Sequence, residues 1–317
     1  MDAEFAGNEA ALTVLRRAAM GGRRHHAYLI YGEKGLGKQT FAMLFARALL
    51  CLAETERPCG RCRACHKAEN GTHPDLTVLI GEKRGSIHVE DVRRLRADCV
   101  VRPNEAPVRV YVIVNMQDMT EEAFNAFLKT LEEPPLHTVF LLTAESPGQL
   151  PQTVVSRALP VELYPLAEEE AARWLRRRFP QRTAEECQDA AAVSGGNLGK
   201  AVEMLASPDS AGMEELARRL LRAAEQGREY ELLQVFSVYE KDKAGQKLLL
   251  ERWMERLRLA LLQPGSTGLR PEQIVRLIEF GGQAREKLDG NANGTLLGAF
   301  CAAGVWNAVR GRPAEEA

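Results

Sequence analysis

The stretch "GEKGLGKQT", Gly32–Thr40, contains residues whose types and spacing predict phosphate chemistry. Phosphate-binding loops follow the pattern G-x-x-x-x-G-K-[S/T], and Gly32, Gly37 and Lys38 fit it, with Gly35 between them. Glycines let backbone N–H groups close on phosphate oxygens, and the lysine reaches the outer phosphates. An apolar run precedes the stretch and a helical pattern follows it, which is the context that such a loop needs.

The magnesium-binding half of this site is missing from the sequence. Hydrolysis of ATP needs Mg²⁺ held by a hydroxyl after the lysine and by an acid at the end of a second strand. Gln39 replaces the hydroxyl, and Thr40 comes one residue late, which turns it about 100° around a helix. Val114 and Asn115 occupy the acidic positions, and Asp118 is expected on a turn beyond the strand. We therefore expect no self-sufficient hydrolysis, while the lysine and the loop amides still allow binding of ATP or ADP.

A second chemical pattern is a cluster of cysteines, of which the last three follow C-x-x-C-x-x-C. They are Cys51, Cys59, Cys62 and Cys65. Zinc takes four soft ligands in a tetrahedron, with thiolates at about 2.3 Å, and a site with four protein ligands is structural. The spacing predicts a structural zinc site, with His66 or His73 as alternative fourth ligands and an iron–sulfur cluster as the alternative metal group.

Composition limits the class of protein. The chain has 317 residues, 45% of them hydrophobic, and a net charge of -1, so no global basic excess indicates nucleic acid. The N-terminus carries acids and no apolar core of a signal peptide, and no stretch approaches the ~20 apolar residues of a membrane helix. We expect a cytoplasmic protein, in which cysteines bind metal or fill the core rather than form disulfides. Cys99, Cys187 and Cys301 are expected in the core.

The elements that must position these residues alternate between strands and helices in the first half of the chain. The strand candidates are Ala27–Tyr31, Asp75–Ile80, Arg109–Val114 and Thr138–Thr143. Helices are expected from about Gly7 to Gly22 and from Thr40 to Leu50, and Val161–Leu166 is expected to lead out of the domain. This alternation predicts a parallel sheet covered on both faces.

The second half of the chain is strand-poor and helical in pattern. "SGGNLG" separates two helices, "SPDSAG" is a linker candidate, and four or five amphipathic helices follow from Met213. The sequence thus predicts an α/β P-loop domain at 1–164 with a zinc module at 51–65. A small helical lid domain at 165–208 and a helical oligomerisation (collar) domain at 209–317 would follow.

Several of these pieces resemble the delta-prime subunits of bacterial DNA polymerase III clamp loaders, a family of AAA+ proteins. The resemblance is carried by "CGRCRAC", "GTHPDLTVL", "AFNAFLKTLEEPP" and "LPQTVVSRALPVEL", and it is close to about Leu205. It implies a hetero-oligomer with gamma/tau and delta subunits that acts on the sliding clamp and primer-template DNA. The gamma/tau relatives keep an intact loop and acidic pair, so the losses at Gln39, Val114 and Asn115 favour delta-prime.

The resemblance also assigns a role to "SRA", Ser156–Ala158. The family motif is Ser-Arg-Cys, whose arginine reaches into the ATP site of the neighbouring subunit, and Arg157 matches that arginine. Without the resemblance, Arg157 reads as a surface arginine after a strand. Gly199 and Lys200 stand where the family has a nucleotide-sensing arginine. His25 and His26 belong to the family pattern but indicate no chemical role.

Three hypotheses follow. The first is a non-hydrolysing clamp-loader subunit whose Arg157 completes a neighbour's ATPase site. The second is a gamma/tau-like ATPase, and the third is a free-standing zinc-containing protein that binds DNA. The near-neutral charge and the lack of an aromatic and basic stripe argue against the third.

Overall fold

The structure is a computed structural model, and it describes residues 5–21, 24–80, 86–206, 210–239, 242–263, 265–289 and 294–310. The chain forms two compact units. The first comprises Met1–Glu170 and Asn197–Gly199, and the second comprises Ala171–Gly196 and Lys200–Ala317. Each unit is described by itself.

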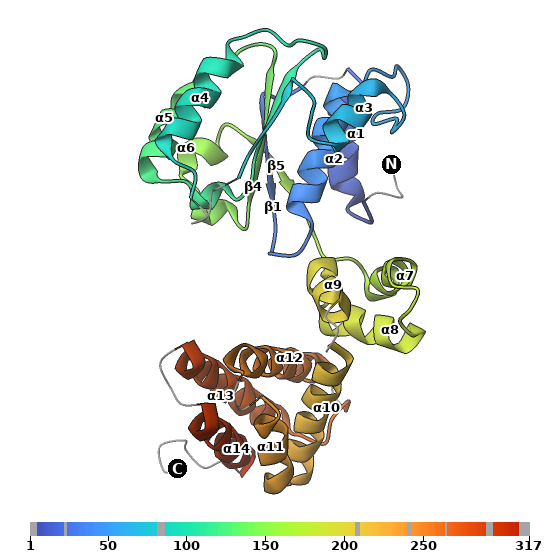
Figure 1. Cartoon of the computed structure of the whole chain (residues 1–317), viewed down its shortest axis with the longest axis vertical. Coiled ribbons are helices and arrows are strands. Elements are labelled where there is room, and N and C mark those ends of the chain that lie inside the picture. Colours follow the sequence, from blue (N-terminus) through green and yellow to red (C-terminus); the bar gives the residue numbers. More distant parts are fainter. Residues whose placement is uncertain are drawn as a thin grey trace. The chain divides into compact units, whose positions relative to one another are not determined.

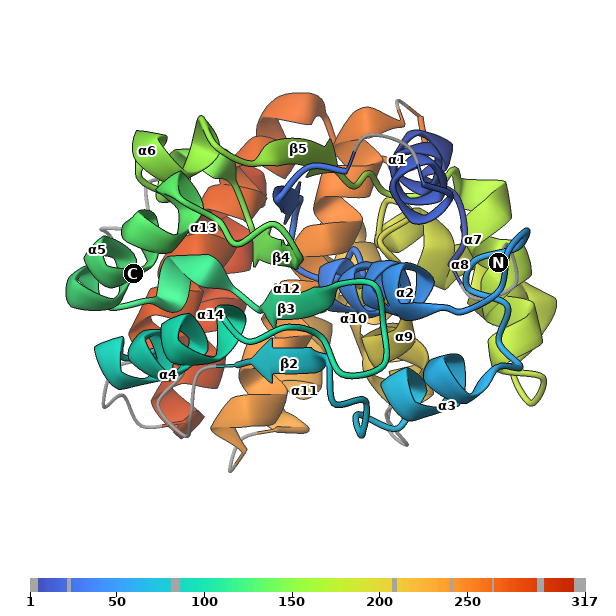
Figure 2. The ribbon, with the colours of Figure 1, turned by 90° about the horizontal axis from the view of Figure 1, so that it is seen from above.

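The first unit is built on a five-stranded parallel sheet in the order β2-β3-β4-β1-β5. The strands are β1 Ala27–Tyr31, β2 Leu76–Leu79, β3 Arg109–Ile113, β4 Thr138–Ala144 and β5 Leu159–Glu162. Figure 2 shows the sheet from above, with β5, β4, β3 and β2 succeeding one another. The four predicted strands are confirmed, and a fifth strand, β5, ends within Val161–Leu166, the stretch expected only as the exit from the domain.

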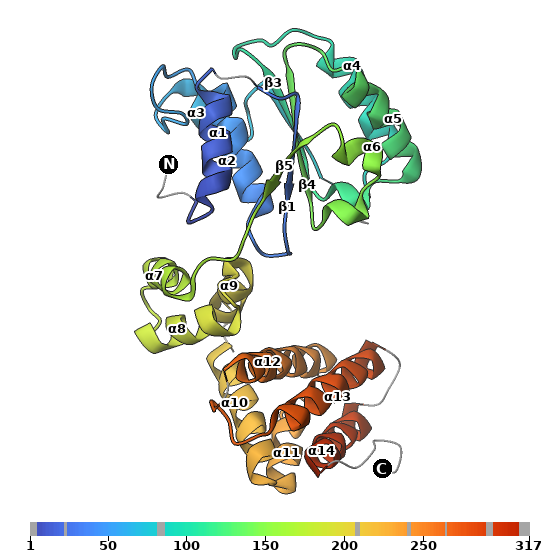
Figure 3. The same cartoon turned by 180° about the vertical axis from the view of Figure 1, so that it is seen from behind.

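Helices cover both faces of this sheet (Figures 1 and 3). On one face α1 Glu9–Ala19 and α2 Lys38–Leu50 share a core with Ile30, Val112 and Leu141. On the other face α4 Val89–Cys99, α5 Glu121–Glu132 and α6 Gln152–Val155 share a core with Leu29, Tyr111 and Phe140. Successive side chains of a strand point to opposite faces, so one apolar run supplies both cores. Helix α3 Arg63–Glu69 and the 3₁₀ helices η1 Met116–Asp118 and η2 Pro147–Gln149 complete the unit.

Helix α5 has clear start and stop signals. The hydroxyl of Thr120 caps its N-terminus by accepting from the N–H of Ala123, and two acids occupy the first turn. Phe127 and Leu131 are buried on the sheet side. Two prolines follow at 134 and 135, where the helix has ended. The helix is therefore a well-anchored element up to its last residue.

The second unit consists of helices. They are α7 Glu168–Arg178, α8 Ala184–Val193, α9 Leu198–Ala206, α10 Ser210–Gln226, α11 Glu229–Ser237, α12 Lys243–Leu262, α13 Pro271–Asp289 and α14 Gly294–Arg310, of which the first residues of α7 and α9 belong to the first unit. Trp253 of α12 is fully buried in its core. Helices α10–α14 match the four or five helices predicted after the linker. Across the described ranges, no helix is both long and apolar enough to span a membrane.

The predicted boundary between a lid domain at 165–208 and a collar domain at 209–317 falls where residues 207–209 are not described. The linker candidate "SPDSAG" lies partly outside the described residues for the same reason. Ion pairs join α8 to the later helices, since Asp189 contacts both Arg218 of α10 and Arg256 of α12. The division into two helical domains stays a prediction.

Candidate functional site

The predicted phosphate loop connects β1 to α2 and has the backbone that its glycines allow. Gly35 and Gly37 have φ angles of 94° and 77°, in the left-handed region that disfavours side chains. Gly37 is the N-cap residue of α2, and Lys38 is the first residue of the helix. The loop is therefore placed at a helix N-terminus, as the motif requires.

Lys38 is engaged within its own loop. Its Nζ donates to the carbonyl oxygens of Gly32 and Glu33, at 2.6 and 2.8 Å. Only 8% of the residue is exposed. Burial lowers the pKa of Lys38, and the negative charges of Glu145 and Glu33 oppose that shift. The ammonium group that would meet outer phosphates is thus satisfied by main-chain carbonyls.

The segment Asn197–Gly199 lies against the same loop. The side-chain Nδ2 of Asn197 donates to the carbonyl of Lys34 at 2.9 Å, and the N–H of Gly199 donates to the carbonyl of Gly35 at 2.9 Å. A Cβ atom at Gly35 would lie 2.4 Å from Oδ1 of Asn197. The position expected to sense nucleotide therefore contacts the loop through its main chain, while the sensor role of Lys200 stays a prediction.

Phe5 packs on the loop as well. Its ring meets Phe41 edge-on at 5.2 Å between centroids, and a Cβ at Gly37 would lie 3.3 Å from its Cε2. Asn8 joins this N-terminal segment to the chain after β5, because its side chain exchanges two hydrogen bonds with the main chain of Tyr164. The loop is therefore packed against two other segments of its own unit.

The magnesium positions have the character that the sequence predicted. Gln39 and Thr40 are exposed on α2. Val114 is buried, and the N–H of Asn115 donates to the hydroxyl of Thr143 at 2.8 Å. Asp118 is exposed in η1, beyond the end of β3. Neither position at the end of β3 supplies a carboxylate for Mg²⁺.

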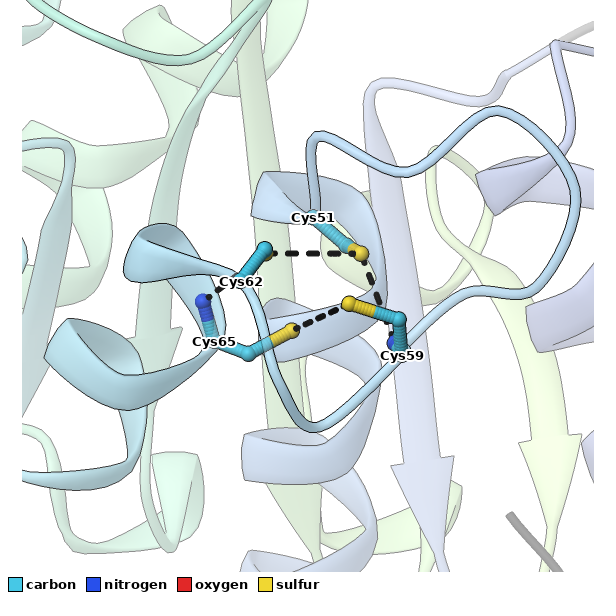
Figure 4. Close-up of side chains that lie close together, drawn as sticks. All are labelled: Cys51, Cys59, Cys62 and Cys65. Carbon is cyan, nitrogen blue, oxygen red and sulfur yellow. Dashed lines mark hydrogen bonds between the residues drawn. The ribbon is translucent and has the colours of Figure 1, made fainter.

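The four predicted cysteines lie together (Figure 4). Their sulfur atoms are all within 4.8 Å of one another, with Cys51 and Cys62 at 3.9 Å and Cys59 and Cys65 at 4.0 Å. A tetrahedron of thiolates with zinc bonds of about 2.3 Å has sulfur atoms about 3.8 Å apart. The donor set and its spacing therefore fit a zinc ion, and neither histidine weighed as an alternative ligand belongs to the cluster.

Backbone N–H groups surround these sulfur atoms. Cys51, the C-cap residue of α2, accepts from the N–H groups of Ala53 and Cys59, at 3.5 and 3.4 Å. Cys62 caps the N-terminus of α3 and accepts from the N–H of Cys65 at 3.4 Å. Burial acts to raise the pKa of Cys62, but N–H donors from Leu52 and Cys65 and the nearby thiols lower it to about 6. Thiolate is the form that binds metal.

The cysteine module is fixed to the sheet through residues that the sequence analysis did not single out. Lys67 of α3 contacts Glu105 at 2.6 Å. The carboxylate of Asp75, just before β2, accepts from the main-chain N–H groups of Asn104, Glu105 and Ala106 at 2.6, 2.8 and 2.9 Å. An acid at the start of a strand is a sign that it accepts hydrogen bonds from nearby backbone, and Asp75 stands at such a position. The sequence could not identify its partners, because they lie about 30 residues along the chain.

Arg157 lies between α6 and β5, so its predicted place after a strand is wrong: it follows a short helix and precedes the strand. Its Nη1 donates to the carbonyl of Thr153 at 2.9 Å and to the hydroxyl of Ser156 at 3.3 Å. Its Nη2 donates to Oε1 of Glu132 at 3.1 Å. The side chain is 35% exposed, so the arginine is held by the protein and is still partly open to solvent.

Arg157 and the phosphate loop lie at opposite ends of the parallel strands, the arginine at the amino ends and the loop at the carboxyl ends. The loop follows β1, whereas Arg157 precedes β5, and these two strands are parallel neighbours. Tyr31 beside the loop pairs with Glu162, while Leu159 at the start of β5 pairs with Tyr28. A strand rises about 3.3 Å per residue, so the length of β5 separates the arginine from the loop of its own chain.

Other predicted residues remain outside these sites. Cys99, Cys187 and Cys301 are buried in the cores, as predicted. His25 contacts Tyr28 through its main chain and the edge of its ring. Burial and the neighbouring His25 lower the pKa of His26, and neither histidine joins a metal-binding group in the described part of the chain.

Comparison with known proteins gives consistent matches. The family model described as "DNA polymerase III, delta subunit" matches residues 7–167. The chain is 34% identical over 179 residues to the DNA polymerase III subunit delta' of Haemophilus influenzae, covering 56% of this chain and 54% of that protein. It is 38% identical over 187 residues to the subunit delta' of Pseudomonas aeruginosa, covering 56% of each.

The matches extend to tau/gamma proteins. The DNA polymerase III subunit tau/gamma of Haemophilus influenzae is 38% identical over 174 residues, which are 55% of this chain and 25% of that protein. The aligned region spans about half of the delta' relatives and a quarter of the tau/gamma relative.

Among solved structures, a gamma subunit-related protein of DNA polymerase III from Thermotoga maritima aligns with a TM-score of 0.51 at 17% identity. The alignment covers 94% of this chain and 99% of that one. The predicted fold class, a parallel α/β domain of the AAA+ kind followed by helices, is confirmed. The predicted resemblance to delta-prime subunits is also confirmed. Because the family model covers just over half of the chain, the protein belongs to the DNA polymerase III delta subunit family.

Proposed function

We propose that this protein is a non-hydrolysing subunit of the DNA polymerase III clamp loader and that Arg157 serves the ATP site of a neighbouring gamma/tau subunit. The observation that carries the proposal is the position of Arg157. Its side chain is partly exposed at the amino ends of the strands, whereas its own phosphate loop lies at their carboxyl ends. An arginine so placed cannot serve its own loop, but it is available to a second chain.

The chemistry follows from the charge of the reacting phosphate. During ATP hydrolysis negative charge spreads over the oxygens of the transferred phosphoryl group, and a positioned guanidinium stabilises it without moving a proton. Arginine offers a planar set of donors that lysine does not reproduce. In this proposal the neighbour supplies the nucleotide, the magnesium ion and the attacking water, and this chain supplies only Arg157.

The chain's own loop supports a non-hydrolysing role. Lys38 donates to main-chain carbonyls, and Gln39, Val114 and Asn115 replace the magnesium ligands. The similarity to tau/gamma proteins makes a gamma/tau-like ATPase the second candidate. That candidate requires a magnesium site that these residues do not provide.

The proposal includes partners and a metal. Gamma/tau and delta subunits would flank the chain in the cytoplasm, and the assembled loader would act on the sliding clamp and primer-template DNA. One zinc ion held by Cys51, Cys59, Cys62 and Cys65 would fix the module after α2. With four protein ligands such an ion supports structure rather than catalysis.

Arg157→Ala in a reconstituted loader tests the proposed function. We expect the variant to assemble, while ATP turnover stimulated by clamp and primed DNA falls together with clamp loading. Arginine fingers contribute roughly 10³- to 10⁵-fold at the site they serve, and bulk turnover in a loader with several sites falls less. Arg157→Lys should also be defective, because it lacks the planar fork.

Two controls complete this test. Arg16→Ala removes another partly exposed arginine that pairs with a glutamate, and it should leave turnover unchanged. The isolated chain should not hydrolyse ATP. Wild-type turnover by a loader shown to contain Arg157→Ala would contradict the proposed function, and turnover by the isolated chain that Lys38→Ala abolishes would favour the second candidate.

A further inference from the structure

The guanidinium of Arg157 is held in a defined orientation by three acceptors. Nη1 donates to the carbonyl of Thr153 and the hydroxyl of Ser156, and Nη2 donates to Glu132. An arginine has five N–H donors. Nε–H and the second proton of Nη2 donate to none of the described residues. The arginine is therefore oriented by some of its donors while others stay available.

Two of these acceptors belong to the same local segment as Arg157, and the third belongs to a different helix. Thr153 and Ser156 lie within four residues of Arg157, on the same short helix and turn. Glu132 lies 25 residues earlier, so it alone ties the guanidinium to a different element. Without it, the outer end of the side chain would be held only by its own turn.

Glu132 is itself well placed to orient another side chain. It is the last residue of α5, whose Phe127 and Leu131 are buried against the sheet. The capped N-terminus and the prolines at 134 and 135 fix where the helix begins and ends. The carboxylate therefore starts from a rigid backbone, although half of the side chain is exposed.

The ion pair has little to contribute to stability. Its side chains are 35% and 50% exposed, and exposed pairs between long side chains add little to the folded state because water screens them. Its effect on orientation is different, because a long arginine side chain loses much rotational freedom when it must meet a phosphate. Holding it beforehand removes that loss from the reaction.

We infer that Glu132 is a positioning residue for Arg157, which holds the guanidinium so that its remaining donors are presented to the phosphate of a neighbouring chain. This inference rests on the proposed function of Arg157. Glu132 does not touch the nucleotide, since a carboxylate beside the phosphoryl oxygens would oppose their charge. It acts only through the arginine.

The neighbouring residue supplies a matched control. Glu133 has the same side chain and charge, is exposed, and is the C-cap residue of α5 rather than its last residue. Within the described residues it forms no ion pair with Arg157, whereas Glu132 does. A general effect of removing negative charge at the end of α5 would therefore appear in variants of both Glu132 and Glu133. An effect on the orientation of Arg157 would appear only in variants of Glu132.

The experiment compares five reconstituted loaders, carrying Glu132→Ala, Glu132→Gln, Glu133→Ala, Arg157→Ala and the double variant Glu132→Ala with Arg157→Ala. Steady-state ATP turnover is measured with clamp and primed DNA present. For Glu132→Ala we expect kcat to fall about 10-fold, as for a group that is misplaced rather than removed, with KM for ATP unchanged. Glu132→Gln should retain more activity because its amide oxygen still accepts a hydrogen bond.

The double variant separates positioning from an independent role. If Glu132 acts only through Arg157, removing it from a chain that already lacks the arginine changes nothing further. Glu133→Ala should match the wild type. Glu132→Lys, which repels the guanidinium, should be at least as slow as Glu132→Ala, and it replaces that variant in the comparison if the alanine chain does not assemble.

The outcomes distinguish this inference from the proposed function. If Arg157→Ala is slow and Glu132→Ala turns over at the wild-type rate, the positioning role is overturned and the finger role stands. A double variant slower than Arg157→Ala by the full effect of Glu132→Ala also overturns it. If Arg157→Ala is itself unaffected, the proposed function fails and the positioning role fails with it.

Discussion

Cys62 carries the most direct test of the metal at the scale of single residues. We expect one tightly bound zinc ion per chain, because four sulfur atoms lie at the spacing of a tetrahedral site. Cys62→Ser removes one thiolate ligand, whereas its hydroxyl can still cap α3, so the zinc content should fall markedly without loss of the helix start. Elemental analysis of protein made without added metal measures it, and Cys99→Ala, which alters a core cysteine, should keep the zinc.

A zinc content below about half an equivalent, unchanged in Cys62→Ser, would leave the cluster as four packed thiols. Iron with the absorbance of a cluster in place of zinc would support the alternative metal group. Either result concerns only the module, because none of these cysteines is among the hydrogen-bond partners found for Arg157 in the described residues.

Residues whose pattern is local could be identified from the sequence as site residues, and residues with distant partners could not. The glycines and lysine of the phosphate loop and the four cysteines form patterns within a few residues, so the sequence identified them. The bond between Asn197 and Lys34 joins positions 163 residues apart, and the pair of Glu132 and Arg157 joins positions 25 apart. Such pairs depend on how distant segments pack in the folded chain, which no local pattern records.

At the scale of elements, the loop at residues 104–106 depends on one carboxylate. Asp75 accepts from three consecutive N–H groups there. Asp75→Asn replaces a charged acceptor with a weaker one and turns an amide donor toward these donors, so the free energy of unfolding should fall by about 1–3 kcal/mol. Urea unfolding at pH 7 measures it, with the exposed Asp118→Asn as the control.

The same residue gives the expected pH dependence. Burial acts to raise the pKa of Asp75, but the N–H groups of Asn104, Glu105 and Ala106 bring it below its ordinary value of 3.8. A carboxyl whose pKa is lower in the folded state stabilises the fold above the unfolded-state value, and that contribution is lost as the pH falls through the folded-state value. The difference between the wild type and Asp75→Asn should narrow below about pH 4, and a difference that grows with acid would contradict this account.

The buried central strands were predicted closely, and of the two partly exposed edge strands β2 was predicted whereas β5 was missed. β1, β3 and β4 are apolar runs in the middle of the sheet, and the sequence located each to within a residue. β5 is a four-residue edge strand that contains Pro160 and is partly exposed, so its composition reads as a connection. Because β5 was not predicted, Arg157 was expected to follow a strand, whereas it precedes β5.

At the scale of the whole molecule, we expect the helices after residue 210 to mediate assembly. Large apolar side chains remain exposed there, including Tyr230 and Leu233, which are one turn apart on α11. Replacing both with aspartate should leave the thermal unfolding temperature nearly unchanged, because neither is in the core. It should weaken incorporation into a loader, measured by size-exclusion chromatography with gamma/tau and delta subunits.

A chain ending at residue 207 should lose assembly altogether and retain the zinc content of the first unit. Tyr164→Asp, which alters an exposed aromatic residue of the first unit, serves as the control for the α11 variant. If the shortened chain joins the loader with unchanged affinity, the C-terminal helices have another task.

The glycines of the phosphate loop are required by packing as well as by any role in phosphate binding. A side chain at Gly35 would collide with Asn197, and one at Gly199 would lie 2.5 Å from the backbone of Gly35. Glycine at these positions is therefore demanded by the close fit of two protein segments, with no nucleotide involved. Gln39 and Thr40 point into solvent and carry no such demand. In chains built this way, substitutions should accumulate at the two exposed positions while the glycines persist, so the glycine pattern alone is not evidence of ATP hydrolysis.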